Sequence, residues 1–241
     1  SKRVDIALFV PSLRGGGAER VMVNLTRGFV ERGLQVDLVL AKAEGPYLSQ
    51  VPQSVRVVDL ESRRVLYSLP GLVRYLRQER PYAMLSTLSH ANIIALWAKR
   101  LAHVPMRLVI REANTISVSR CNASSLRGKW MPLLMRKFYH WADAVVANSH
   151  GNAKDLAKVV GIPLERIKVI YNPVVTPQLF AKAKESLEHP WFQPGEPPVV
   201  LGVGRLTKQK DFSTLVRAFA LVRKECPVRL MIFGEGEERP K

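Results

Sequence analysis

The sequence has little cysteine: neither Cys121 nor Cys226 belongs to a Cys-x-x-Cys pair or to a His cluster at metal-ligand spacing. A disulfide scaffold and a zinc finger are thereby excluded, and we expect a protein of the reducing cytoplasm. The sequence also lacks any run of about 18 uncharged apolar residues, and residues 1–10 resemble a strand more than a signal peptide. It therefore predicts no transmembrane helix.

Acidic residues are scarce beside basic ones: 20 Asp and Glu stand against 37 Lys and Arg, which gives a formal net charge of +17. Self-repulsion of this size weakens a compact state unless an anionic partner offsets it. Nucleic acid, an anionic membrane surface and phosphorylated substrates are the partners that suit such a charge. Because 47% of the residues are hydrophobic, the composition excludes disorder and predicts a globular chain with a full core.

Short apolar runs alternate with amphipathic helical patterns along the first 171 residues. Strands are predicted at residues 4–10, 36–40, 55–60, 83–86, 108–111, 144–148 and 168–171. Helices are predicted at residues 18–32, 69–79, 91–102, 128–141 and 151–159. Strands separated by helices of this length specify a parallel sheet covered on both faces, which is the Rossmann-like, doubly wound α/β architecture.

Six prolines between residues 173 and 198 interrupt this alternation. We therefore predict an amino-terminal domain over residues 1–176, a proline-rich linker over 177–198 and the start of a second domain over 199–241. The last part holds a predicted strand at 199–203, a helix at 211–224 and a strand at 228–233. Two strands and one helix cannot close a core, so we expect the sequence to be the beginning of a longer protein.

Three consecutive glycines, Gly15, Gly16 and Gly17, follow the first predicted strand and precede a helix. Glycine lets the backbone approach an oxygen-rich ligand, and free amides at a helix N-terminus bind phosphate. Gly16 and Gly17 are therefore candidate diphosphate-binding residues, with a tight turn that binds no ligand as the alternative. Arg20 stands where the G-x-G-x-x-G pattern needs its third glycine, which argues against NAD.

Several motifs together resemble the family-four retaining glycosyltransferases. The matching segments are GGGAERVMVNL (15–25), IREAN (110–114), ANSHGNAKDL (147–156), IPLERIKVIYNPV (162–174), GVGRLTKQKDFSTLVRAFALV (202–222) and LMIFGEGEE (230–238). The resemblance implies the GT-B fold, in which two Rossmann-like domains face a cleft. It also implies transfer of a sugar from a nucleotide sugar, such as a UDP-sugar, with retention of configuration, in polysaccharide biosynthesis.

The resemblance assigns roles to particular residues. Arg205 and Lys210 correspond to the basic pair that holds the donor diphosphate, and their chemistry suits a leaving group that gains negative charge. Glu112 stands where many relatives have a histidine, as in a subgroup that acts on lipid-linked or cell-surface polysaccharide acceptors. Glu112 is therefore the candidate catalytic residue; helix capping or an ion pair with Arg111 or Arg120 is the alternative.

The family's carboxylate pair in the second domain has no counterpart here, so we expect the 241-residue chain to be a fragment without activity of its own. His90 and Asn114 are candidate residues for the acceptor or the cleft, because they follow predicted strands at the ligand-binding edge of a doubly wound sheet. A capping or packing role is the alternative for His90. No D-x-D motif is present, so we expect neither a metal ion nor another cofactor.

Residues 126–141 mix basic and aromatic side chains on a predicted helix. Such a mixture suits the headgroup region of an anionic membrane, and we name Lys129, Trp130, Arg136 and Lys137 as membrane-facing, with Phe138 adding apolar surface. An ordinary amphipathic helix packed on the sheet is the alternative.

The sequence shows no RNA-binding motif, zinc finger or helix-turn-helix, so we expect no nucleic acid. We expect a protein of the cytoplasm, peripheral on the inner face of the cell membrane. A non-catalytic module that binds a phosphorylated ligand in the same cleft is the alternative function.

Overall fold

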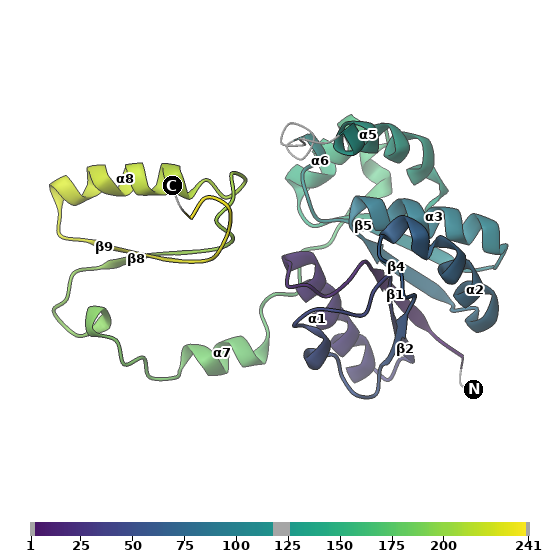
Figure 1. Cartoon of the computed structure of the whole chain (residues 1–241), viewed down its shortest axis with the longest axis horizontal. Coiled ribbons are helices and arrows are strands. Elements are labelled where there is room, and N and C mark those ends of the chain that lie inside the picture. Colours follow the sequence, from purple (N-terminus) through teal and green to yellow (C-terminus); the bar gives the residue numbers. More distant parts are fainter. Residues whose placement is uncertain (1–2, 118–125, 240–241) are drawn as a thin grey trace. The chain divides into compact units, whose positions relative to one another are not determined.

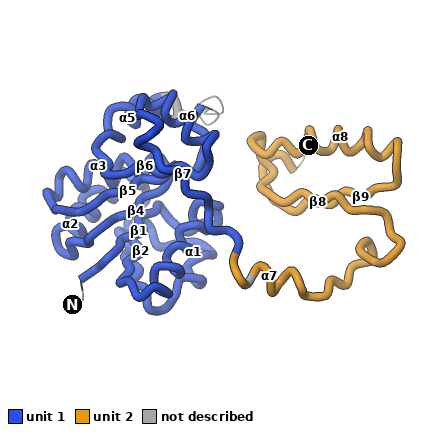
Figure 2. Tube along the Cα trace, turned by 180° about the vertical axis from the view of Figure 1, so that it is seen from behind, with its two compact units in different colours: residues 1–175 blue, residues 176–241 orange. Residues whose placement is uncertain are grey.

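The computed structural model describes residues 3–117 and 126–239 of the chain (Figure 1). The chain divides into two compact units (Figure 2). We call residues 1–175 the first unit and residues 176–241 the second unit. The boundary between them falls just after Pro173, where prolines begin to interrupt the alternation of strands and helices.

The first unit is built on a seven-stranded parallel sheet. Its strands are β1 (Ile6–Val10), β2 (Val36–Leu40), β3 (Arg56–Asp59), β4 (Ala83–Thr87), β5 (Arg107–Glu112), β6 (Ala144–Ala147) and β7 (Ile167–Val169). They lie in the order β3-β2-β1-β4-β5-β6-β7, and all neighbouring strands are parallel. This order reverses direction between β1 and β4, as in doubly wound nucleotide-binding folds.

Helices cover both faces of this sheet. They are α1 (Gly17–Glu31), α2 (Leu69–Glu79), α3 (Ser89–Ala102), α5 (Leu126–Phe138) and α6 (His150–Val160), with the 3-10 turns η1 (Leu48–Gln50), η2 (Val65–Ser68), η3 (Tyr139–Trp141) and η4 (Leu164–Arg166). Successive side chains of a strand point to opposite faces, so Phe9 joins a core with α2, α3, α5 and α6, while Leu8 joins a core with α1. Figure 1 shows α1 and α3 on opposite sides of β1 and β4.

The predicted α/β architecture is confirmed, and β2 and α2 begin and end at the predicted residues. Other bounds differ from the prediction, and two of the differences concern candidate site residues. The predicted helix at 128–141 ends earlier, because α5 stops at Phe138 and a 3-10 turn follows. Glu112, predicted in a loop, is the last residue of β5 and pairs with Ala147 of β6.

The second unit holds a two-stranded parallel sheet of β8 (Val199–Val203) and β9 (Arg229–Phe233), connected by α8 (Phe212–Glu225). Before the sheet come α7 (Pro177–Ala183) and the 3-10 turn η5 (Pro190–Phe192). The helix α7 was not predicted within the proline-rich stretch. It is compatible with proline because Pro177 occupies its first turn, where a missing N–H costs no hydrogen bond.

We predict faster amide hydrogen exchange in β8 and β9 than in the strands of the first unit. Large apolar side chains of the second unit are exposed, among them Val203 at 71% and Leu221 at 65%, and a two-stranded sheet is marginally stable by itself. Exchange measured by mass spectrometry on the 241-residue chain checks this. Protection of β8 as strong as that of β5 would contradict it.

Candidate functional site

The carboxyl ends of β1 and β4 meet where the strand order reverses, which is the usual ligand-binding edge of such a sheet. The glycine turn follows β1, and the turn Leu88–Ser89 follows β4. The end of β5, next to β4, carries Glu112 and leads to Asn114. The predicted residues of the first unit, apart from those on α5, therefore lie along one edge of the sheet.

The glycine turn is closed by a carboxylate of its own helix. Gly16 is the N-cap of α1 and Gly17 its first residue, while the Glu19 side chain accepts a hydrogen bond from the amide of Gly16. A diphosphate at this helix end would meet the negative charge of Glu19 and would compete with it for that amide. The role of Gly16 and Gly17 in binding a diphosphate stays a prediction.

The turn between β4 and α3 is strained. Leu88, the N-cap of α3, has a φ of +77°, a conformation that favours glycine and costs about 1–3 kcal/mol in other residues. His90 lies in the first turn of α3, and its side chain is exposed to the pocket described next. Desolvation by the surrounding protein lowers the pKa of His90, which favours the neutral imidazole.

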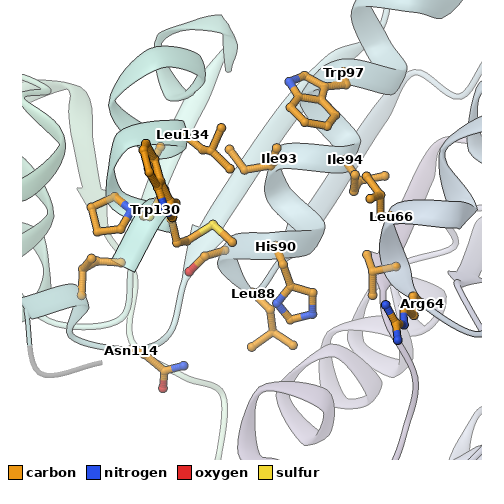
Figure 3. A pocket seen from close by; sticks show the side chains of 16 residues that line it. Arg64, Leu66, Leu88, His90, Ile93, Ile94, Trp97, Asn114, Trp130 and Leu134 are labelled. Atoms are coloured by element: carbon orange, nitrogen blue, oxygen red, sulfur yellow. The ribbon is translucent and has the colours of Figure 1, made fainter. Parts of the chain in front are cut away.

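A large apolar pocket lies beside this edge, between α3, α5 and η2. Its volume is about 910 Å³. Figure 3 shows Ile93 of α3 near Leu134 of α5, with Trp97 further along α3, Leu66 on a further wall and the His90 ring near the middle of the labelled side chains. The pocket brings together three residues that the sequence singled out, His90, Asn114 and Trp130. We call this cavity the α3–α5 pocket.

Glu112 is the centre of a buried polar cluster beneath the pocket. It is 1% exposed, and its carboxylate accepts hydrogen bonds from Tyr139 Oη, from Asn92 Nδ2 at 2.8 Å and from Ser89 Oγ at 3.1 Å. Ser89 also lines the pocket. The described residues give Glu112 no ion pair with Arg111, and Arg120 lies outside them.

Burial raises the pKa of Glu112, while hydrogen bonds from Tyr139, Asn92 and Ser89 and the charge of Arg111 oppose this rise. A carboxylate enclosed in this way is out of reach of a substrate as the chain is folded here. The geometry therefore suits a positioning residue that fixes the start of α3. Direct contact between Glu112 and a substrate stays a prediction, and the burial of Glu112 does not support it.

A neighbouring set of hydrogen bonds fixes the segment that leaves the sheet after β7. Arg111 is 4% exposed and donates to Thr87 Oγ1 at 2.9 Å and to Asn172 Oδ1 at 2.5 Å. Asn24 of α1 donates to the carbonyl of Pro173 at 2.9 Å. The chain is thus held by β5 and α1 up to Pro173, two residues before the end of the first unit at Val175.

The sequence alone did not indicate a role for Asn92, for Tyr139 or for the apolar walls of the pocket. Asn92 left a signal, because it is a polar residue inside the apolar run ANIIALWA of α3 and is completely buried. Buried amides need partners, so a polar contact could have been expected there. Tyr139 gave no comparable signal.

We predict that Glu112→Ala lowers the free energy of unfolding by about 3 kcal/mol, because it leaves the buried Tyr139 hydroxyl without its acceptor and removes one of the acceptors of the buried Asn92 amide. Chemical denaturation of the 241-residue chain measures this. The matched change Glu165→Ala, at an exposed position, should stay within about 0.5 kcal/mol. An equal effect of the two changes would contradict the prediction.

The raised pKa of Glu112 also predicts how the stability of the chain depends on pH. Unfolded Glu112 ionises near its ordinary pKa of 4.5 and the folded group ionises higher, so its contribution to stability is fully present below pH 4.5 and declines as the pH rises through the folded pKa. Between pH 4.5 and the folded pKa of Glu112, the free energy of unfolding of the wild-type chain should therefore fall relative to that of the Glu112→Gln variant.

The exposed face of α5 combines basic and apolar residues. Trp130 and Leu133 are 62% and 56% exposed, and Arg136 and Lys137 are exposed as well. With 3.6 residues per turn, these four positions fall within about a third of the helix circumference. Lys129 also belongs to α5, but its side chain lies outside the described residues.

The opposite face of α5 packs inward, which is the alternative that the sequence left open. Met135 is fully buried, and Phe138 makes edge-to-face contacts with Trp97 and Trp141. No helix within residues 3–117 or 126–239 has both the length and the apolar character needed to cross a bilayer.

In the second unit, Arg205 and Lys210 are exposed in the loop between β8 and α8. The Lys210 side chain runs beside Gly204, the residue before Arg205. The segment after β9 packs against this loop backbone to backbone: a Cβ on Gly234 would lie 1.8 Å from the carbonyl oxygen of Gly204. Across the described residues, neither basic side chain has an ion pair, and no cluster of His, Cys, Asp or Glu could hold a metal ion.

A Rossmann-like sheet with this strand order, followed by a second unit that starts another parallel sheet, has the architecture of GT-B glycosyltransferases. The chain belongs to glycosyltransferase family 4, because the model of that family matches residues 15–177.

The curated relatives of the chain include proteins with glycosyltransferase names. The chain is 30% identical over 244 residues to the N-acetylgalactosamine-N,N'-diacetylbacillosaminyl-diphospho-undecaprenol 4-alpha-N-acetylgalactosaminyltransferase of Campylobacter jejuni, covering 96% of this chain and 62% of the relative. It is 25% identical over 230 residues to the lipopolysaccharide core biosynthesis glycosyltransferase LpsE of Rhizobium meliloti, covering 94% of this chain and 58% of that protein. The chain thus spans about 60% of these relatives.

Among solved structures, the chain is similar to the apo form of the lipopolysaccharide outer core galactosyltransferase WaaB. The TM-score is 0.65 at 17% identity, and the match covers 98% of this chain and 62% of that one. A likeness at this identity shows the shared fold.

Proposed function

We propose that this chain belongs to an enzyme that transfers a sugar from a nucleotide sugar to a lipid-linked precursor of a cell-surface polysaccharide, with retention at the anomeric carbon. The α3–α5 pocket carries the proposal, because it places His90 and Asn114 in an apolar cavity beside the ligand-binding edge of the sheet. The Campylobacter relative is named for an acceptor linked to undecaprenol diphosphate, and we carry that acceptor class over.

Each candidate residue has a defined task in this proposal. The neutral imidazole of His90 accepts a hydrogen bond from an acceptor hydroxyl, and the Asn114 amide helps to orient the same sugar. Glu112 positions the start of α3 through Ser89 and Asn92. Arg205 and Lys210 stabilise the charge that develops on the leaving diphosphate, in place of a metal ion.

The test is product analysis by mass spectrometry. A form of the protein that carries the complete second domain is incubated with a panel of nucleotide sugars, UDP-sugars included, and a lipid-diphosphate-linked oligosaccharide. We expect one sugar to be added to that acceptor. Binding of the substrates with no product from any donor would contradict the proposed function and favour a binding module.

A further inference from the structure

We propose that the α3–α5 pocket binds the isoprenoid chain of the acceptor lipid, at the end of the chain that carries the phosphate. This inference rests on the proposed function and extends it from the sugar to the lipid. It assigns to the first unit a binding site for a branched hydrocarbon.

The shape of the pocket suits a flexible hydrocarbon. Its volume of about 910 Å³ is near the upper end of the range of about 300–1,000 Å³ for small-molecule sites. Ile93 and Trp97 of α3 form one wall, and Met131 and Leu134 of α5 form the facing wall. Between these two walls a sugar would lose its hydrogen bonds with water and find few partners, so the acceptor sugar is assigned to the polar lining residues His90 and Asn114. A hydrocarbon gains free energy for each carbon that it buries between the walls.

Charge around the pocket suits a lipid that ends in phosphate. Arg64 lines the pocket, its guanidinium is exposed, and Arg63 beside it is exposed as well. None of the ion pairs in residues 3–117 and 126–239 involves either arginine. A guanidinium binds phosphate oxygens with parallel hydrogen bonds, so Arg64 is placed to hold the phosphate while the chain lies between α3 and α5.

Apolar residues continue from the pocket onto the surface. Leu66 and Trp130 line the pocket and are 48% and 62% exposed, and Tyr67, next to Leu66, is 62% exposed. These side chains extend the apolar surface from the interior of the pocket to the outside of the first unit. A long isoprenoid can therefore occupy the pocket with its first units while its remainder stays in a membrane.

The test is calorimetric titration of the 241-residue chain with inorganic pyrophosphate, geranyl diphosphate and farnesyl diphosphate. Each buried methylene increases affinity by about fourfold, so farnesyl diphosphate should bind at least about tenfold more tightly than geranyl diphosphate, and pyrophosphate should bind most weakly. Equal affinity for all three would overturn the proposal. Dodecyl phosphate is the straight-chain comparison, and binding as tight as that of farnesyl diphosphate would overturn the isoprenoid assignment.

Two adjacent leucines of α5 offer a matched pair of variants. Leu134 lines the pocket, whereas Leu133 is exposed and does not line it. Leu134→Trp fills the cavity and should weaken farnesyl diphosphate binding at least about tenfold, while Leu133→Trp should leave it unchanged. Should Leu134→Trp fail to fold by circular dichroism, Ile93→Phe narrows the same cavity from α3. Loss of binding in Leu133→Trp alone would place the lipid on the outer surface and overturn the proposal.

The experiments can refute lipid binding in the α3–α5 pocket and the proposed function independently of each other. An enzyme that transfers sugar equally well to acceptors with a farnesyl chain and with a short, water-soluble linker would keep the proposed function and refute the pocket's role. Farnesyl diphosphate binding that Leu134→Trp removes would support the pocket even if no sugar transfer were found.

Discussion

Replacing Arg205 and Lys210 together with alanine should slow sugar transfer by about 100-fold or more. The leaving diphosphate gains negative charge in the transition state, and loss of a preorganised donor to such charge typically costs about 10²–10³ in rate. Both side chains are exposed at the carboxyl end of β8, and within the described chain neither is held by an ion pair. They are therefore free to bind a diphosphate.

The measurement is the initial rate at saturating donor, on a form of the protein that carries the complete second domain. Arg223→Ala with Lys224→Ala is the matched control, because it removes the same two residue types from exposed positions in the last turn of α8. The control variant should transfer sugar at the wild-type rate, and both double variants should have the melting temperature of the wild-type protein. A normal rate in the Arg205 and Lys210 double would place the phosphate site elsewhere.

Much of the fold could be predicted because its signals are local. The run VDLVL gives the bounds of β2, since a strand buried on both faces of a parallel sheet is apolar at nearly every position. The end of α2 could be predicted as well, because Pro81 follows one residue after the C-cap Arg80 and cannot continue a helix.

The Glu112 cluster could not be predicted because its contacts depend on the order of the strands. Asn92 and Tyr139, which both donate to Glu112, are 47 residues apart in sequence. Asn92 reaches Glu112 because β4 pairs with β5, which brings the start of α3 beside the end of β5. Tyr139 reaches it from η3, which lies against α3. Nothing in a local pattern reports which strands are neighbours. A lone glutamate after a strand therefore appeared to be a loop residue open to substrate.

The aromatic residues of α5 show a second limit of sequence patterns. Trp130 and Phe138 were both expected at a membrane surface, but Phe138 packs between Trp97 and Trp141 while Trp130 is exposed. The two residues are eight apart, and a helix turns through about 80° more than two full turns over that distance. Periodicity separates their directions, but it does not say which direction faces the core.

The exposed face of α5 is the basis of the second prediction, which concerns binding to anionic membranes. We predict that the 241-residue chain sediments with anionic vesicles and not with neutral ones, and that replacing Lys129, Arg136 and Lys137 with serine lowers its vesicle affinity by roughly 100-fold. Each basic residue near an anionic surface contributes about 1 kcal/mol, so three contribute about 3 kcal/mol. Co-sedimentation over a series of lipid concentrations measures the affinity.

A charge-matched control separates a local contact from the effect of net charge. Replacing Arg32, Lys154 and Lys168 with serine removes the same charge from three exposed sites outside α5. If α5 is the membrane contact, this control should lose far less affinity than the α5 variant. Equal losses would show that the net charge of +17 attracts the protein to vesicles without a defined face.

The effect of salt on vesicle binding distinguishes the electrostatic part of the membrane contact from its apolar part. Raising the ionic strength should weaken the binding that Arg136 and Lys137 provide, because exposed charges are screened beyond about 10 Å at 0.1 M salt. The contribution of Trp130 and Leu133 is apolar and should persist, so Trp130→Ser should reduce the affinity that remains at high salt. A chain that ignores anionic vesicles, or that prefers duplex DNA to them, would instead require a soluble acceptor or a nucleic-acid partner for its charge.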